Sequence, residues 1–134
     1  MHRGYSARIL CVDDEPVALA VRKMLLEHFG FQVFAATSGE EALHIFSTQP
    51  LDLVISDHML QGTLGTKIAA SMKAKNAAVP IMILSGATDI PEGMEFADCF
   101  LSKLEPPPVL LKTVDGLLNR KMAYPTTGQE AEAS

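Results

Sequence analysis

Short apolar runs alternate with longer amphipathic segments along most of this chain, and that alternation limits the fold more than any other feature of the sequence. Continuous apolar runs are typical of strands covered on both faces, and the segments between them have the three- and four-residue spacing of helices. Repetition of strand and helix indicates βα units and a parallel sheet. The sequence therefore predicts an α/β fold whose five strands are residues 8–12, 31–36, 51–56, 79–84 and 98–101.

Capping residues and prolines predict where the helices begin and end. Pro16 starts a first helix that Gly30 closes, and further helices are expected over about 38–47, 66–74 and 107–122. The spacing of apolar residues indicates which face of each helix is buried. For the first helix these residues are Val17, Val21, Met24 and Leu25, with Arg22 elsewhere, and for the last they are Leu110, Leu111, Val114, Leu117 and Leu118.

The stretch between the fourth and fifth strands is too short for a full helix with its loops. Residues 86–97 have to supply two loops as well as the helix, and such loops normally take about 2 to 6 residues each. Pro91 and Gly93 interrupt what remains. The fourth helix is therefore expected to be short or absent, with one or two turns at most.

The length and composition are those of one folded unit. A chain of 134 residues has room for a single domain, since domains commonly run from about 50 to 250 residues. Apolar residues make up 48% of the sequence and charged residues 20%, as in ordinary globular proteins. We expect one domain over residues 1–122, with its core in 8–122, and a polar, disordered C-terminal tail over 123–134.

Charge and hydropathy argue against several classes of partner. The net charge is -5 and the Lys and Arg residues are scattered, so we expect no direct contact with nucleic acid. No apolar run approaches the roughly 20 residues that cross a bilayer, and the polar start lacks a secretory signal, so the expected location is cytoplasmic, without a membrane partner. Cys11 and Cys99 lie inside expected strands and are interpreted as buried free thiols rather than disulfide or metal ligands.

Charged and polar residues follow four of the expected strands. Asp13 and Asp14 follow the first, Asp57 the third and Ser85 the fourth, and Lys103 comes just after the fifth. Ligands of open parallel sheets bind outside the carboxyl ends of the strands, so these residues are expected to meet there. Each has a plainer explanation when taken alone, as a helix cap, a turn former or a solvated charge. Their joint position at strand ends favours a functional site.

Three carboxylates crowded at one edge repel each other, and a divalent cation with oxygen ligands relieves that repulsion. Mg²⁺ suits such a site, and it usually keeps waters that a phosphoryl oxygen can replace. Asp57 could then attack phosphorus to form an aspartyl phosphate, with Mg²⁺, Lys103 and the Ser85 hydroxyl neutralising the charge that develops. His58 follows Asp57, but side chains alternate at strand ends, so it is expected to point away.

The chain resembles the response-regulator receiver domains of two-component signalling, over roughly residues 8–122. The motifs that carry the resemblance are LCVDDEP, DLVISDHM, IMILSG and ADCFLSKLEPP, which are specific as a set. It implies a flavodoxin-like, doubly wound sheet with strand order 2-1-3-4-5.

The resemblance also implies roles for individual residues. Asp14 and Asp57 would ligate Mg²⁺ together with the Met59 carbonyl, and Asp13 would act mostly through a water. Phosphorylation of Asp57 would draw the switch residue Ser85 toward the phosphoryl group, and the ring of Phe100 would move inward. Such a change is a population shift between two packings.

Two positions near the site depart from the family pattern. Leu104 follows Lys103 where the family usually has proline, and a cis bond before a non-proline residue costs about 2.5 to 4 kcal/mol. This cost favours a trans peptide, but the sequence leaves the choice of isomer open. Gln61 replaces another common proline, which suggests a looser loop after Asp57.

The leading hypothesis is a stand-alone receiver that takes phosphate from a histidine kinase or a phosphotransfer protein and signals through contacts with a downstream protein. A pseudo-receiver, used as a phosphorylation-independent docking module, is the first alternative, and homodimerisation stays open. A phosphatase or phosphotransferase that turns over an external substrate is disfavoured, because Met59 stands where such enzymes need a second acid. Met59 and Ala87 also suggest slow self-hydrolysis of the phosphorylated form.

Overall fold

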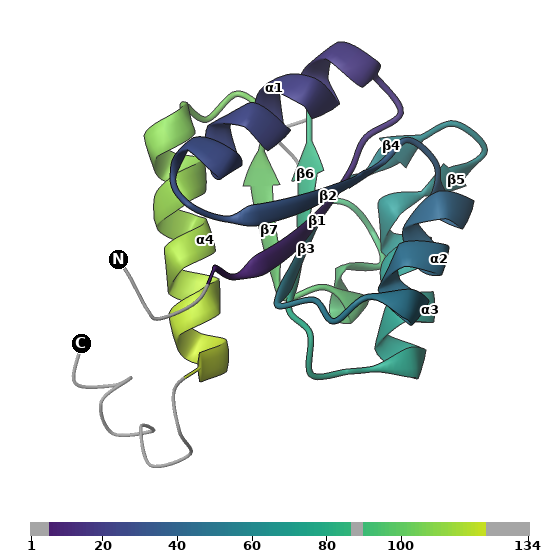
Figure 1. The fold of residues 1–134 in the computed structure, drawn as a ribbon. Helices are drawn as coiled ribbons and strands as arrows, with labels where there is room; N and C mark the ends of the chain where they lie inside the picture. The colour runs from purple at the N-terminus through teal and green to yellow at the C-terminus, as the bar shows by residue number, and fades with distance from the viewer. Residues whose placement is uncertain (1–5, 87–89, 123–134) are drawn as a thin grey trace.

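The computed structural model describes residues 6–86 and 90–122, which form a parallel sheet covered by helices on both faces (Figure 1). The five strands of the sheet are β1 (Arg8–Val12), β2 (Gln32–Ala36), β3 (Leu53–Asp57), β6 (Ile81–Ser85) and β7 (Cys99–Ser102). Their order is β2-β1-β3-β6-β7, and every neighbouring pair is parallel. This order is the predicted 2-1-3-4-5 arrangement, so the predicted fold class is confirmed.

Helices lie on both faces of the sheet, as Figure 1 shows. Helices α1 (Pro16–His28) and α4 (Pro107–Met122) cover one face, and α2 (Gly39–Thr48) and α3 (Gly65–Lys75) cover the other. The central strands are apolar on both faces because both faces are buried. Alternate residues of β1 show this directly, since Ile9 and Cys11 pack toward α1 and α4 whereas Leu10 and Val12 pack toward α2 and α3.

The helix ends follow the signals in the sequence. Ser38 caps α2 by accepting a hydrogen bond on its Oγ from the Glu41 backbone N–H, and the Glu41 carboxylate in turn accepts from the Thr37 N–H. Gly30 follows α1 with a φ of +95°, a left-handed conformation that favours glycine. The apolar face predicted for α4 is also buried, with Val114 and Leu118 fully covered.

The prediction for the buried face of α1 was wrong for three of its four residues. Val17, Val21 and Met24 are 69%, 59% and 67% exposed, whereas Leu25 is partly buried against the core. The other residues of α1 turned toward the sheet are Leu19, Arg22 and Leu26. Both sets recur at helical spacing, so the sequence pattern alone does not choose between them. In the structure, the side of α1 that faces the sheet is the one that also carries Arg22, whose ion pair is described below.

The segment between β6 and β7 is as short as predicted. In its described part, the helical structure is a single 3-10 turn over Met94–Phe96, preceded by Gly93 at φ +87°. A Cβ atom on Gly93 would lie 2.9 Å from the Thr66 side chain of α3, so the backbone packs closely there. Ala87 lies outside the described residues, as does the predicted tail over 123–134.

The loop after β3 is more ordered than the sequence suggested. β4 (Met59–Leu60) and β5 (Thr63–Leu64) form a short antiparallel hairpin, in which Gly62 has a φ of +85°. None of the described peptide bonds is cis, so the Lys103–Leu104 peptide, whose isomer the sequence left open, is trans.

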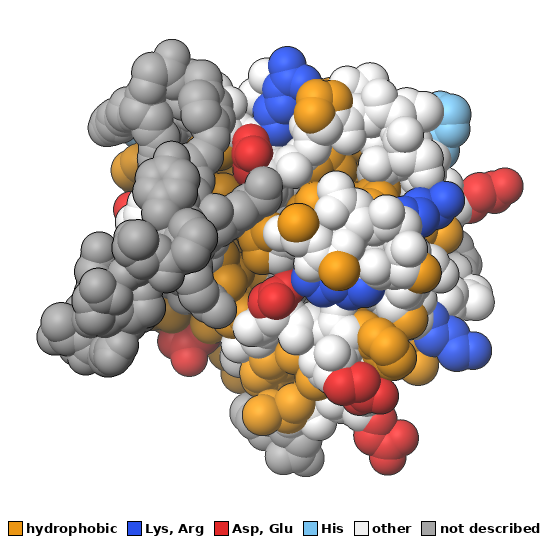
Figure 2. All heavy atoms as spheres, turned by 90° about the horizontal axis from the view of Figure 1, so that it is seen from below, with side chains coloured by type: hydrophobic (Ala, Val, Ile, Leu, Met, Phe, Trp, Pro, Cys, Tyr) orange, Lys and Arg blue, Asp and Glu red, His pale blue; other side chains and the backbone are white. Residues whose placement is uncertain are grey.

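The described helices can be compared with the length of a membrane span, and one face of the molecule shows how its basic side chains are distributed. No described helix is long and apolar enough to cross a bilayer. On the face seen from below in Figure 2, the Lys and Arg side chains lie in separate places, with acidic and apolar side chains between them. That face lacks the continuous basic surface typical of nucleic-acid binding.

Candidate functional site

The register of the sheet brings the predicted site residues to one edge. Val12 of β1 pairs with Ser56 of β3. The residues that come next, Asp13 and Asp57, are therefore neighbours. On the other side of β3, Asp57 pairs with Leu84, which places Ser85 beside it. Ser85 pairs in turn with Ser102, and Lys103 follows. The site therefore depends on parallel strands that end at the same level.

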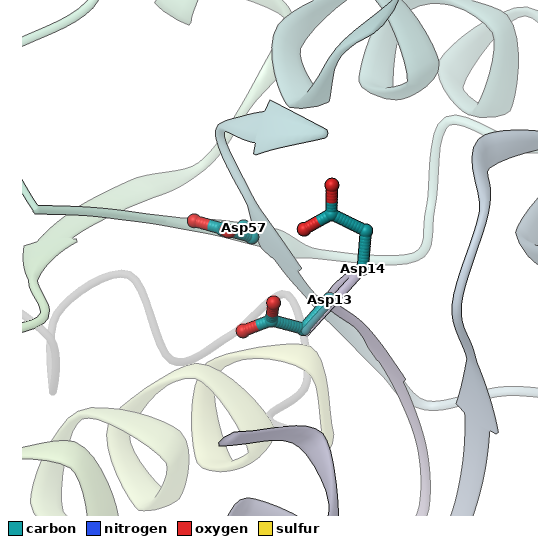
Figure 3. A group of neighbouring side chains, drawn as sticks. All are labelled: Asp13, Asp14 and Asp57. Atoms are coloured by element: carbon teal, nitrogen blue, oxygen red, sulfur yellow. The ribbon is translucent and has the colours of Figure 1, made fainter. Parts of the chain in front are cut away.

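Three carboxylates meet at this edge (Figure 3). Asp13, Asp14 and Asp57 each offer an oxygen within 4.8 Å of the others. Asp13 is completely buried and Asp57 is 7% exposed, whereas Asp14 is partly open to solvent. Figure 3 shows their side chains turned toward a shared space, Asp13 and Asp14 from the end of β1 and Asp57 from the end of β3.

Lys103 bridges two of these carboxylates. Its Nζ lies 3.1 Å from Asp57 Oδ2 and 3.3 Å from Asp13 Oδ2. The Lys103 backbone N–H donates to the Ser85 carbonyl at 2.8 Å, which extends the β6–β7 ladder up to the site. Lys103 thus reaches the acidic group although a trans peptide and Leu104 follow it.

Asp13 is held on both carboxylate oxygens. Oδ1 accepts from the Glu15 N–H at 3.0 Å, and Oδ2 accepts from Lys103 and from Arg22 Nη1, which is 3.2 Å away. Arg22 was missed by the sequence analysis. The signal that could have found it is its spacing from Leu19 and Leu26, because all three share one face of α1.

Asp14 is not used as a helix cap. The N-cap of α1 is Glu15, whose carboxylate accepts from the Ala18 N–H at 3.1 Å. Among the described residues, none donates a hydrogen bond to the Asp14 carboxylate. The plainer explanation of Asp14 as a cap therefore fails, and its oxygens are available to a ligand.

Burial raises the pKa of Asp57 above its ordinary value, because taking the carboxylate out of water disfavours its charged form. The ammonium of Lys103 acts in the opposite direction, through its hydrogen bond and its charge, and Arg22 adds a smaller effect of the same sign. The result is a carboxylate that is poorly hydrated but paired with a cation. A carboxylate in this setting is better suited to attack an electrophile than one that is fully solvated.

The donor set fits Mg²⁺. The cation prefers oxygen ligands and usually binds through one or two carboxylates together with waters. Asp14 and Asp57 could supply such ligands directly, whereas Asp13 is already occupied by cationic donors and suits contact through a water. Met59 begins β4 and its side chain is 64% exposed, but its carbonyl as a ligand stays a prediction.

The proposed switch residues lie on β6 and β7. Ser85 is 4% exposed at the end of β6, and Phe100 is partly buried on β7, where it pairs with Ile83. The structure thus places Ser85 at the site edge and Phe100 within the neighbouring strand. Their movement on phosphorylation stays a prediction.

The backbone of Asp57 is enclosed by α3. Gly65, the first residue of that helix, donates its N–H to the His58 carbonyl, and a Cβ atom added to Gly65 would collide with the Asp57 carbonyl. His58 Nδ1 is buried and has no hydrogen-bond partner among the described residues.

The fold and this edge define a doubly wound α/β domain with an acidic pocket and a lysine at the carboxyl ends of its strands. The family model of the response regulator receiver domain matches residues 9–115. The chain belongs to this family, in which phosphorylation and dependence on magnesium are general.

Curated relatives and solved structures agree with this assignment. The aerobic respiration control protein ArcA of Escherichia coli (strain K12) is 34% identical over 126 residues, which cover 91% of this chain and 52% of ArcA. The transcriptional regulatory protein GlrR of the same strain is 29% identical over 118 residues, covering 85% of this chain and 27% of GlrR. The chain therefore spans about a quarter to a half of these relatives' length.

Two solved receivers have the same fold. A CheY-like receiver domain protein from Methanospirillum hungatei JF-1 superimposes with a TM-score of 0.81 at 25% identity, covering 87% of this chain and 96% of that one. Response regulator protein TrrA of Thermotoga maritima, solved in complex with Mg²⁺-BeF, has a TM-score of 0.79 at 31% identity, covering 83% and 98%.

Proposed function

We propose that this chain is a phosphorylation-controlled switch in which Asp57 accepts a phosphoryl group from a phosphohistidine of a kinase or phosphotransfer protein, in a reaction that depends on Mg²⁺. The observation that carries the proposal is the placement of Lys103 Nζ within 3.3 Å of both Asp57 and Asp13, beside three carboxylates within 4.8 Å of one another. The groups that the proposed reaction requires, namely carboxylates that could attack phosphorus or bind a metal and a cation that could neutralise charge, thus lie at one edge.

The transfer forms a bond between an Asp57 carboxylate oxygen and phosphorus while the bond from phosphorus to the donor imidazole nitrogen breaks. The electron pair of that bond stays on the imidazole, which leaves as a neutral ring once protonated. Lys103 neutralises negative charge on the transferring oxygens, and the Ser85 hydroxyl is proposed to donate to one of them. Bound Mg²⁺ supplies further neutralisation of the phosphoryl oxygens.

Exposed apolar side chains around the site favour a protein as the phosphodonor. Val17 follows the acidic pair, Met59 lies two residues after Asp57, and Leu104 follows Lys103; they are 69%, 64% and 74% exposed. A small phosphodonor needs no such surface, whereas protein contacts are centred on apolar residues that lose water on binding. We call Val17, Met59 and Leu104 the apolar rim.

Movement of Ser85 and Phe100 on phosphorylation is proposed to change the surface that a downstream protein binds. Relatives such as GlrR and ArcA are named as regulators and are longer than this chain, and one is named as transcriptional. We propose that this receiver acts in the cytoplasm and signals through protein contacts without itself touching nucleic acid.

A phosphorylation-independent docking module is the second candidate. The observation that favours it is the double pairing of Asp13 with Lys103 and Arg22, which satisfies part of the acidic site without a metal. In that case the chain would bind its partner equally well before and after treatment with a phosphodonor.

The deciding experiment is labelling with acetyl phosphate, in Mg²⁺ or in EDTA, followed by intact-protein mass spectrometry. We expect one phosphoryl group in Mg²⁺, none in EDTA and none in Asp57→Asn. Asp115→Asn, an exposed change on α4, is the matched control and should label as the wild type does. Persistent labelling of Asp57→Asn would move the acceptor elsewhere, and no labelling of the wild type would favour the docking module.

A further inference from the structure

Arg22 is a buried cation in the acidic site that the proposed chemistry does not use. It lies in the middle of α1, where its side chain is 11% exposed, and its Nη1 is 3.2 Å from Asp13 Oδ2. The same oxygen receives Lys103 Nζ at 3.3 Å. An ion pair between exposed side chains contributes little to folding stability. Asp13 has no exposed surface, so removing one of the cations paired with it is expected to destabilise the fold more strongly.

The presence of Arg22 changes the charge that a metal ion meets. Three carboxylates against the Lys103 ammonium have a formal charge of -2, and the guanidinium reduces it to -1. Guanidinium stays protonated at any ordinary pH, so this reduction is permanent. A cation entering the site meets a weaker negative potential and an additional positive charge close to one of the carboxylates.

The surroundings of Arg22 leave it room to adjust. A cavity of about 80 Å³ is lined by Arg22, Lys103 and Glu105 together with apolar residues of β6, β7 and α4. Glu105 is the acidic residue of this lining, so a second carboxylate besides Asp13 borders the cavity that both cations line.

We propose that Arg22 is a positioning residue that holds Asp13 in place and sets the affinity of the acidic site for a divalent cation. It stabilises the metal-free fold by offsetting repulsion among the carboxylates, and it weakens Mg²⁺ binding for the same reason. The inference rests on the proposed function in one respect, namely that Mg²⁺ binds at this site.

The test compares Mg²⁺ binding by isothermal titration calorimetry for the wild type and three Arg22 variants. Arg22→Met keeps the aliphatic stem and removes the charge, Arg22→Gln removes the charge with a polar end, and Arg22→Lys keeps the charge. We expect the two neutral variants to bind Mg²⁺ about 3- to 30-fold more tightly than the wild type, and Arg22→Lys to stay within about twofold of it.

A second readout is urea denaturation in EDTA. The neutral variants should be less stable than the wild type, and the loss should shrink when Asp13→Asn is combined with them, because the charge that Arg22 offsets is then gone. If Arg22→Met fails to fold, the comparison of Arg22→Gln with Arg22→Lys is used for both the Mg²⁺ affinity and the stability in urea. Unchanged or weaker Mg²⁺ binding by a folded neutral variant would overturn the inference.

The same measurements distinguish failure of the proposed metal site from failure of the proposed role of Arg22. If the wild type binds no Mg²⁺, or if Asp14→Asn binds it as tightly as the wild type, the proposed metal site itself is wrong. If the wild type binds Mg²⁺ and Asp14→Asn does not, but the Arg22 variants match the wild type, only the role of Arg22 is wrong.

Discussion

Lys103 Nζ lies 3.1 Å from Asp57 Oδ2, so a residue after β7 is paired with the last residue of β3. The pairing spans β6, which lies between these strands in the sheet. It offers a positive charge where charge would develop if Asp57 attacked phosphorus.

Replacing Lys103 with methionine should slow phosphorylation of Asp57 by acetyl phosphate. Removal of one preorganised charge-stabilising donor typically costs about 100- to 1000-fold in rate. The initial labelling rate at saturating Mg²⁺ measures the effect. Lys112→Met, an exposed change on α4, should leave the rate unchanged, and a Lys103→Met rate within twofold of wild type would contradict the assigned role.

The ionised form of Asp57 should destabilise the metal-free fold. Its pKa is raised in the folded state, mainly by burial, so between the unfolded pKa and the folded pKa the folded chain binds more protons than the unfolded chain. Protonated Asp57 makes its whole contribution to the free energy of unfolding at a pH below the pKa of Asp57 in the unfolded chain. The contribution is lost as the pH rises through the pKa of Asp57 in the folded chain.

Asp57→Asn removes this titration. In EDTA, its stability relative to the wild type should increase as the pH rises from about 4, the unfolded pKa of an aspartate, and then become constant. Urea denaturation at a series of pH values measures the difference. A difference that declines with pH would contradict the sign.

Gly65→Ala should destabilise the fold by about 1 to 3 kcal/mol, the usual cost of overpacking. Its Cβ would collide with the Asp57 carbonyl, which is backbone and cannot turn aside. Gly116→Ala is the control, since nothing lies within 4 Å of its Cβ and alanine favours the interior of α4 by about 1 kcal/mol. Urea denaturation should therefore show opposite signs for the two changes, and equal effects would argue against close packing at Asp57.

Lys73→Met should cost about 1 to 3 kcal/mol of folding stability. Lys73 Nζ donates to Asp98 Oδ2 at 2.8 Å and to the carbonyls of Val79 and Ala77 at 2.9 and 3.2 Å, with the side chain 18% exposed. Lys23→Met breaks an exposed pair with Glu27 and should cost no more than about 0.5 kcal/mol. A thermal melt of each variant tests the contrast, which fails if both lose the same stability.

Changes in the apolar rim should separate protein donors from small ones. Val17→Gln with Leu104→Gln should slow transfer from a phosphorylated histidine phosphotransfer domain about tenfold, because desolvated apolar contacts are lost, while labelling by acetyl phosphate is unchanged. Phe29→Gln is the control, about 18 Å further along α1 than Val17. Equal slowing with both donors would mean that the rim acts on the chemistry and not on docking.

Much of the fold could be read from the amino-acid sequence. The strand order was inferred from a family resemblance, and β1 and α4 were placed with the observed bounds. These inferences succeeded because buried parallel strands need continuous apolar runs, and because prolines and glycines mark helix ends through backbone geometry that each residue carries itself. The residues that meet at the sheet edge could be named in advance for the same reason, since each ends a strand or follows one closely.

The side of α1 that is buried could not be read in this way. Both the Val17 set and the Leu19 set have helical spacing, and the choice depends on contacts with the sheet and on the ion pair of Arg22 with Asp13 at the end of β1. The burial of Asp13 and the double pairing of Lys103 likewise depend on segments that are distant in the chain. A local sequence pattern indicates which conformation a segment prefers. These features instead depend on interactions between segments, and such interactions form only when the chain folds.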